Sequence, residues 1–209
     1  MIVVIGAIAA TGTGPDTTPS GLAAGIALAA AAAGARVEVV TRLGEDAAGD
    51  AVLLGFAAAN VGHVATLRDA AHATRLDHPT EEPTDPDASD GLDDTADPAV
   101  ASAAPTLDAA DVGLAMRYLS EYRVIVVVHP ADAGILHEVV AATSWASAHL
   151  VCVTLPDAPV PMDLPADAVV LAAADDAEGL AGMLGRYVAA VDGGDAPEAA
   201  FRATLGAPA

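Results

Sequence analysis

The stretch GLAAGIALAAAAAGARVEVVTRLGEDAAGD, from Gly21 to Asp50, decides the fold class of this chain. A run of Ala, Leu and Ile from Leu22 to Ala33 favours a helix, and Gly34 is a residue type that commonly ends one. The closely spaced valines after it predict a short buried strand, and the glycines that follow predict a tight loop before a second helix. This order of helix, strand, loop and helix is typical of α/β proteins.

The second half of the chain continues the same alternation. The run RVIVVV consists mostly of β-branched residues, which suits a central strand of a parallel sheet that is covered on both faces. We therefore predict a three-layer α/β/α sandwich with a mainly parallel sheet, whose ligands bind beyond the carboxyl ends of the strands. The elements expected here are helices over residues 108–122 and 133–146 and strands over residues 123–128, 150–154 and 168–171.

Residues 79–105 interrupt the alternation. Between Glu81 and Asp97 this segment holds eight acidic residues, several prolines and no aromatic residue. Such a composition cannot bury enough apolar surface to order the chain. We predict a flexible acidic loop that interrupts a single domain spanning residues 1–209.

The overall composition limits the partners of the protein. The chain carries 29 acidic residues against eight basic ones, all arginine, for a formal charge of -21. This charge repels nucleic acids and anionic membranes, so we expect no partner of either kind. The apolar run from Gly21 to Ala35 is too short to span a bilayer, the start of the chain does not resemble a signal peptide, and Cys152 is the only cysteine. A cytoplasmic location is expected.

Five segments of the chain follow one another in an informative order. They are a strand-like run with a glycine turn (Met1–Gly6), an apolar helix (Gly21–Gly34), a glycine loop (Arg42–Gly49), the segment Asn60–Val64 and the stretch Tyr187–Arg202. In this order they resemble the opening strand and turn, the helix after the sugar loop, the G-x-D-x-x-G loop, the step toward the lid and the last helix pair of the ribokinase-like (PfkB) sugar and nucleoside kinases. The resemblance implies a ribokinase-like, Rossmann-type fold, with a reduced lid of which residues 72–77 are a remnant.

Most residues that bind sugar and phosphate in this family are replaced here. Ala9 and Thr11 stand where the family has an Asn and an Asp that hydrogen-bond the sugar hydroxyls. The family's Asn-x-x-Glu falls near Ala173 and Asp176. Its catalytic G-A-G-D, which precedes the final helix, aligns with residues 178–181, so that Ala181 takes the place of the catalytic Asp. An alignment that omits G-A-G-D also leaves no catalytic Asp.

The retained crevice is expected to keep some polar lining. His129 lies directly after a predicted central strand, and Asp46 belongs to the glycine loop or, in a purely structural role, caps the helix that begins near Ala47. His129, Asp132 and His137 do not have the spacing of three strong metal ligands, so no metal site is predicted. The predicted substrate-binding residues are Thr11, Asp16, Gly21 and His129, and the predicted structural loop contains Gly44, Asp46 and Gly49.

Three functions agree with these patterns. The first is a pseudo-kinase that binds a small molecule such as a sugar or nucleoside, or regulates another protein, without phosphotransfer. The second is a divergent kinase that uses ATP and Mg²⁺, with Asp175 or Asp176 as a substitute base near Gly179. The third is a structural subunit that pairs with a full-length kinase, or with a second copy as a homodimer.

Overall fold

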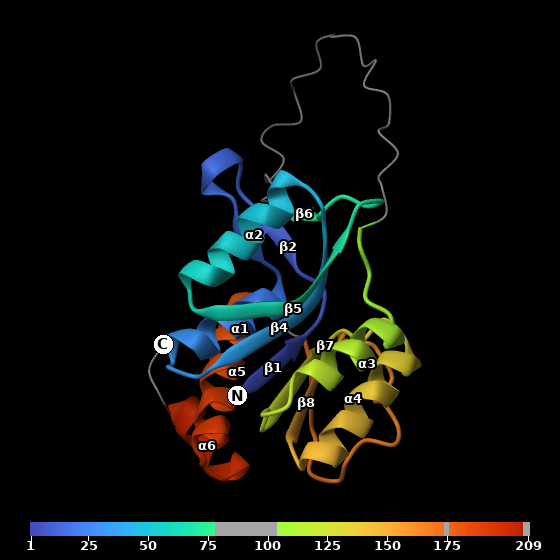
Figure 1. The fold of residues 1–209 in the computed structure, drawn as a ribbon. Coiled ribbons are helices and arrows are strands. Elements are labelled where there is room, and N and C mark those ends of the chain that lie inside the picture. Colours follow the sequence, from blue (N-terminus) through green and yellow to red (C-terminus); the bar gives the residue numbers. More distant parts are fainter. Residues whose placement is uncertain (78–103, 174–175, 207–209) are drawn as a thin grey trace, which may run out of the picture.

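The computed structural model describes residues 1–77, 104–173 and 176–206, and the acidic segment predicted to be flexible lies almost entirely outside these residues. The main sheet has six parallel strands in the order β5-β4-β1-β7-β8-β9 (Figure 1). These strands are β1 (Ile2–Ile5), β4 (Val37–Gly44), β5 (Val61–Asp69), β7 (Val124–Val128), β8 (His149–Thr154) and β9 (Val169–Ala172).

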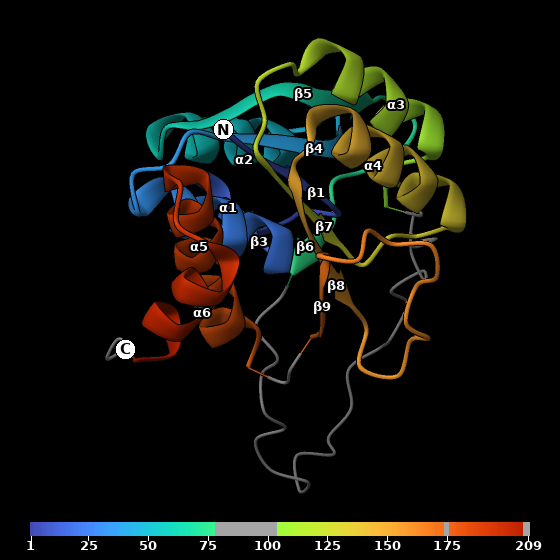
Figure 2. The same ribbon diagram turned by 90° about the horizontal axis from the view of Figure 1, so that it is seen from below.

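Helices cover both faces of this sheet, as Figure 2 shows. One face packs against four helices around a core that includes Phe56 and Tyr187, and the other packs against two helices. The first group contains α1 (Leu22–Ala32), α2 (Ala47–Ala58), α5 (Ala177–Gly193) and α6 (Pro197–Gly206), and the second contains α3 (Ala109–Tyr118) and α4 (Ala133–Ala146). The predicted three-layer sandwich is confirmed. Within the described ranges, no helix combines the length and apolar character needed to cross a membrane.

A small second sheet corresponds to the predicted reduced lid. Its order is β3-β2-β6, with β2 antiparallel to β3 and parallel to β6. The Ser20 hydroxyl donates a hydrogen bond to Asp77 across this sheet, with a distance of 2.7 Å between the two oxygens. Residues 61–64 begin β5, which is an edge strand of the main sheet, and the next strand along the chain is β6 of the small sheet. The lid strands are β2 (Ala9–Thr11), β3 (Thr18–Ser20) and β6 (Leu76–Asp77), and the short 3-10 helix Gly14–Asp16 lies between the first two.

Aspartates begin four of the six helices. Asp46, Asp108, Asp132 and Asp176 each accept a hydrogen bond from the backbone N–H three residues further along. An aspartate at this position satisfies a helix N–H group that otherwise has no partner, and its charge complements the helix dipole. Part of the chain's large negative charge therefore stabilises helix starts.

Small residues allow α1 and α5 to pack closely. Gly25 and Ala181 face each other, and a side chain added at Gly185 would meet Ala29 and the backbone of Ala30 within 3 Å. Farther along α5, the Tyr187 hydroxyl lies 2.8 Å from His149 Nε2 on β8. These contacts hold α5 against α1 and against the sheet.

The two edges of the main sheet differ in character. The outer strand β5 has an irregular register with β4 and carries His63, Arg68 and Asp69. The opposite outer strand, β9, has the sequence VVLA, without charge or proline; its first three residues are half-buried and Ala172 is exposed. Among the described residues, no strand pairs with the outer edge of β9.

Candidate functional site

The carboxyl ends of the strands form the edge where an open α/β sheet binds its ligands. The strand order reverses between β1 and β7, and the cavity at this point measures only about 70 Å³. Gly6 follows β1 there, and a Cβ at this position would lie 3.1 Å from the Ala23 Cβ and from the Val128 carbonyl oxygen. Close packing of α1 on the strands therefore leaves little room at the reversal itself.

A larger cavity of about 680 Å³ lies next to it, between the start of α4 and residues 155–163. We call it the α4 cavity. Its lining comes from the ends of β7 and β8, from one side of α4 and from the proline-rich loop. The polar members are His129, Asp132, His137, Thr154 and Asp163, and the apolar ones include Pro130, Leu136, Val140, Leu155, Pro159, Pro161 and Met162.

His129 directly follows β7 and lines this cavity. Its backbone adopts a left-handed conformation with φ of 47°, and its N–H donates to the Val153 carbonyl at 2.8 Å. Partial desolvation lowers the pKa of its imidazole, so the ring is uncharged at neutral pH. Thr154 is buried beside it at the end of β8. This arrangement offers neutral hydrogen-bonding groups next to an apolar wall.

The predicted substrate-binding residues do not converge on one site. His129 lines the α4 cavity, whereas Thr11, Asp16 and Gly21 are absent from its lining. Thr11 ends a lid strand, and Asp16 is exposed in the 3-10 helix. Gly21 precedes α1 with φ of 92°, a conformation that favours glycine. These three residues belong to the lid side of the molecule.

The possible metal ligands share the α4 cavity but do not form a metal site. His129, Asp132 and His137 all line it. Over the ranges that the structure describes, no three His, Cys, Asp or Glu side chains are grouped as a metal ion would require. Asp132 instead accepts a hydrogen bond from the Ile135 N–H at 3.0 Å and caps α4.

The glycine loop before α2 forms a closed structural unit. Asp46 accepts hydrogen bonds from the Gly49 N–H and the Thr74 N–H, both at 2.7 Å, and the Thr74 hydroxyl accepts one from the Gly44 N–H. A Cβ at Gly49 would lie only 2.4 Å from the Gly44 carbonyl oxygen. The loop therefore holds the start of α2 against the segment that leads into β6, and the N–H groups of Gly44, Glu45 and Gly49 are used within the protein.

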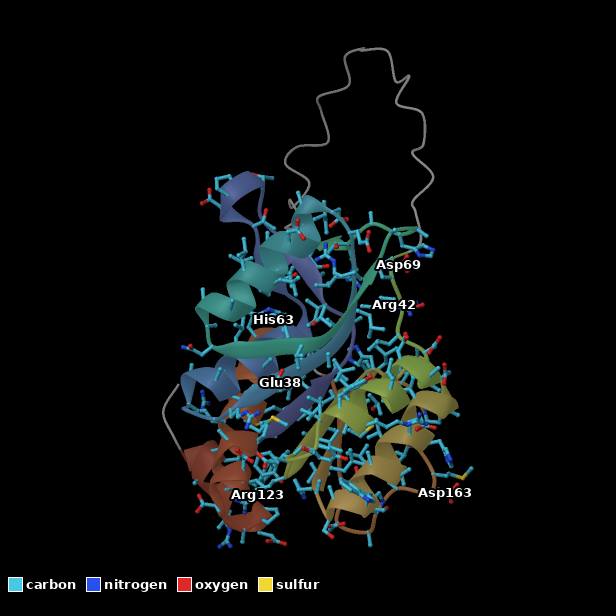
Figure 3. The ribbon with its side chains drawn as sticks, viewed as in Figure 1. Glu38, Arg42, His63, Asp69, Arg123 and Asp163 are labelled. Atoms are coloured by element: carbon cyan, nitrogen blue, oxygen red, sulfur yellow. The ribbon has the colours of Figure 1, made fainter. Side chains whose placement is uncertain are left out.

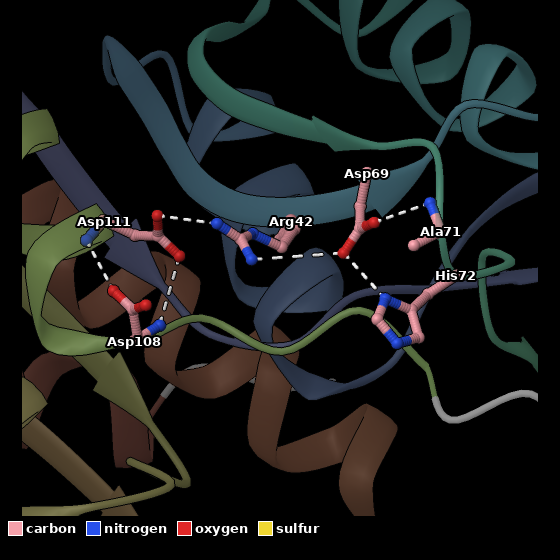
Figure 4. Close-up of polar contacts among 6 residues, drawn as sticks. All are labelled: Arg42, Asp69, Ala71, His72, Asp108 and Asp111. Carbon is pink, nitrogen blue, oxygen red and sulfur yellow. Dashed lines mark hydrogen bonds and ion pairs between the residues drawn. The ribbon is translucent and has the colours of Figure 1, made fainter.

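A charged network next to this loop joins β4, β5 and α3 (Figure 4). Arg42 Nη2 lies 2.8 Å from Asp111 Oδ1, and Arg42 Nη1 lies 4.0 Å from Asp69 Oδ2. The His72 ring donates to Asp69 at 2.9 Å, and Asp108 and Asp111 form a reciprocal capping box on α3. Sequence reasoning missed this network because Arg42 and Asp111 are 69 positions apart. The one indication in the sequence was Arg42 itself, because a charged residue within a mostly buried strand requires a charged partner.

These hydrogen bonds predict a specific acid sensitivity. Burial opposes ionisation of Asp46, but hydrogen bonds from Gly49 and Thr74 outweigh it and lower its pKa below the ordinary 3.8. The pKa of Asp69 is also lowered, mainly by the hydrogen bond from His72. The carboxyl groups of the unfolded chain bind protons more readily than those of the folded protein. The stabilisation that the two ionised carboxylates contribute is therefore present above the ordinary pKa and is lost as the pH falls through their lowered pKa values in the folded protein. We expect the urea concentration at the unfolding midpoint to decrease when the pH is lowered below about 4.

Two double variants test whether Asp46 and Asp69 cause this acid sensitivity. In the double variant Asp46→Asn, Asp69→Asn, the midpoint should be lower at neutral pH and should fall less steeply in acid than in the original protein. A matched variant at two exposed positions, Asp157→Asn with Asp195→Asn, should keep the original acid profile. An unchanged profile in the first variant would contradict the prediction.

The start of α5 contains the residues that the family resemblance aligns with the catalytic motif. Residues 178–181 lie inside the first two turns of α5 and not before it, because the helix begins at Ala177. Ala181 is buried against Gly25 of α1. The residue directly before the helix is Asp176, which is exposed and accepts a hydrogen bond from the Gly179 N–H at 2.8 Å. Asp175 lies outside the described residues.

The positive charges near the carboxyl edge are already paired. Arg68 lies 2.8 Å from Asp50, and Arg75 lies 3.1 Å from Asp77, in addition to the Arg42 pair above. The chain has no lysine, and all eight arginines belong to the described residues. None of them lines the α4 cavity. Figure 3 shows Asp163 beside α4, well separated from Arg42 and Arg123.

Comparisons with known proteins identify the fold. No protein-family profile and no curated protein sequence matches the chain. A putative ribokinase II from E. coli, solved with ATP and Mg²⁺, aligns with a TM-score of 0.66 at 12% identity over 97% of this chain and 89% of its own. A protein designated Sa239 aligns with a TM-score of 0.64 at 12% identity over 100% and 94% of the two chains.

A third structure, an uncharacterized sugar kinase from Pyrococcus horikoshii in complex with ATP, aligns with a TM-score of 0.53 at 13% identity. The alignment includes 89% of this chain but only 60% of the sugar kinase chain. At these identities the similarity concerns the fold. The chain has a ribokinase-like fold, in agreement with the resemblance of its motifs.

Proposed function

We propose that this protein is a pseudo-kinase of ribokinase-like fold that binds a small, non-phosphorylated molecule in the α4 cavity without transferring phosphate. The observation that carries the proposal is the distribution of basic residues. Enzymes that transfer phosphoryl groups stabilise the phosphate charge with Arg, Lys or bound metal ions. In this chain the arginines at the carboxyl edge are paired with aspartates, and none lines the α4 cavity.

The path of the chain supports the same proposal. β9 ends at Ala172 and α5 begins at Ala177, so only four residues connect them. In the kinases whose motifs this chain resembles, the corresponding region forms most of the nucleotide pocket. The space of about 680 Å³ in the α4 cavity is within the usual range for a small-molecule site.

A divergent kinase is the second candidate, because of Asp176. An exposed carboxylate at the start of α5 lies next to backbone N–H groups, which favour a bound anion. If ATP and Mg²⁺ bind there, Asp176 is the residue that would accept the proton of the attacking hydroxyl. The groups present fit this cofactor incompletely, since the helix start supplies N–H groups and a carboxylate, whereas Arg42, Arg68 and Arg75 are paired with aspartates.

Ligand binding distinguishes the two functions. We expect ATP or ADP with Mg²⁺ to leave the thermal midpoint unchanged, and a neutral sugar or nucleoside from a panel to raise it, because a ligand that binds only the folded state stabilises it by mass action. Phosphotransfer to any of these molecules should stay at the level of a sample without protein.

The variant Asp176→Asn makes the test specific. Asn caps helices about as well as Asp, so this variant should keep the fold while removing the base. An increase in thermal midpoint with ATP, together with phosphotransfer that Asp176→Asn abolishes and Asp195→Asn does not, would overturn the pseudo-kinase proposal in favour of the kinase.

A further inference from the structure

We infer that the α4 cavity selects an organic cation, namely an ammonium group attached to an apolar body. This inference rests on the proposed function for the position of the site and adds the chemical class of its ligand. It follows from the carboxylates that line the cavity, from the apolar side chains that share its lining and from the absence of arginine in that lining.

Two carboxylates line the cavity, and no arginine belongs to its lining. Asp132 and Asp163 are part of the lining, and neither forms an ion pair among the described residues. Asp132 caps α4, so its negative charge already compensates the partial positive charge of that helix start. The charge of Asp163 has no such counterpart. The net potential in the cavity is therefore negative and favours a cation.

His129 does not reverse this sign. The lowered pKa of His129 leaves its ring uncharged at neutral pH, and the ring can then accept or donate one hydrogen bond. His137 lies one turn into α4, on the same side as Leu136 and Val140. A polyphosphate would have to displace water from two aspartates without gaining a charged partner. The lining thus disfavours nucleotides more strongly than neutral ligands.

The rest of the lining is mainly apolar and is open to a ligand. Leu136 and Val140 are one helical turn apart on α4, and Met162 and Leu155 approach from the loop. Met162 is 84% exposed and Leu155 is 55% exposed, which is high for large apolar side chains. Covering such surface contributes about 25 cal/mol per Å². Methionine also adapts its shape to different ligands. A ligand with an apolar body would bury these side chains.

Three molecules of one shape test the charge preference: cyclohexylamine, cyclohexanol and cyclohexanecarboxylate. Each is titrated into the full-length protein, and binding is followed by backbone amide shifts in NMR spectra. The titrations are run in about 0.5 M NaCl, where screening suppresses general attraction of cations to the acidic surface. We expect the amine to shift the amides of His129, Ala133 and Asp163 and to bind at least tenfold more tightly than the alcohol. The carboxylate should bind more weakly than either.

Conservative variants assign the preference to the two aspartates. Asn retains the cap at position 132 and tolerates the left-handed backbone at position 163, where φ is 67°. In Asp132→Asn, Asp163→Asn, the amine should bind no more tightly than the alcohol, whose affinity should stay unchanged. The matched control Asp195→Asn, at an exposed position away from the cavity, should keep the preference.

The outcomes separate this inference from the proposed function. Equal binding of amine and alcohol in the original protein would overturn the cation preference and leave the α4 cavity as a site for neutral ligands. Tightest binding of the carboxylate would overturn both the preference and the argument from basic residues. If none of the three molecules shifts the cavity amides, the α4 cavity is not the ligand site. Both the proposed position of the site and the cation preference are then wrong.

Discussion

Gly185→Ala should destabilise the protein by at least about 2 kcal/mol, although alanine is the better helix former. The added Cβ would lie 2.4 Å from the Ala29 Cβ, 2.7 Å from the Ala30 nitrogen and 2.9 Å from the Ala29 carbonyl carbon. Two of these neighbours are backbone atoms of α1, which cannot move without shifting the helix. The measurement is the free energy of unfolding in urea.

Gly182→Ala provides the matched control on the same helix. A Cβ at Gly182 would meet only an Arg186 guanidinium nitrogen, at 3.6 Å. This substitution should stabilise the protein by about 0.5–1 kcal/mol through helix propensity alone. Equal effects of the two substitutions would show that α1 and α5 are not in close contact at Gly185.

Asp46→Ala should cost about 3 kcal/mol of unfolding free energy, since it removes a charged acceptor from two backbone N–H groups. The Gly49 and Thr74 N–H groups both bond to this carboxylate at 2.7 Å. Without it, α2 loses its cap and the segment before β6 loses one of its hydrogen bonds to the loop, while the bond from the Gly44 N–H to the Thr74 hydroxyl remains. Urea unfolding measures the total cost, and amide hydrogen exchange at Thr74 measures the local opening.

Two substitutions separate these contributions. Asp132→Ala removes a cap with a single hydrogen bond, to Ile135, and should cost about 1 kcal/mol. Asp46→Asn keeps one acceptor oxygen and places an NH₂ group at the other position, so its cost should fall between the two alanine variants. If Asp46→Ala costs no more than Asp132→Ala, the bond to Thr74 contributes nothing to stability.

Much of the fold was predictable because its signals are local. The small-residue helix from Leu22 was predicted to end at Ala33, and it ends at Ala32. The run after Arg123 forms a strand whose five residues are all buried, as its β-branched sequence predicts. Helix propensity, glycine stops and apolar runs each act within a few residues, so a single sequence contains the information that they require.

The site was harder to predict because it depends on contacts between distant segments. His129 was identified from its position after a strand, but the α4 cavity exists only because residues 155–163 pass beside α4. Residues 178–181, expected before the final helix, lie within α5, because the length of the connection after β9 sets where the helix begins and motif similarity does not define that length. The pairing of Arg42 with Asp111 likewise needed the tertiary structure.

The two sheet edges have a consequence for how the protein behaves in concentrated solution. An outer strand without charge or proline is a template for pairing with a second chain, and VVLA in β9 has neither of these protective features. The formal charge of -21 supplies repulsion between molecules instead. Electrostatic repulsion, which dissolved ions screen, therefore opposes association of the molecules through β9. The strand itself has no protective feature in its sequence. Low ionic strength is therefore the condition that keeps these molecules apart.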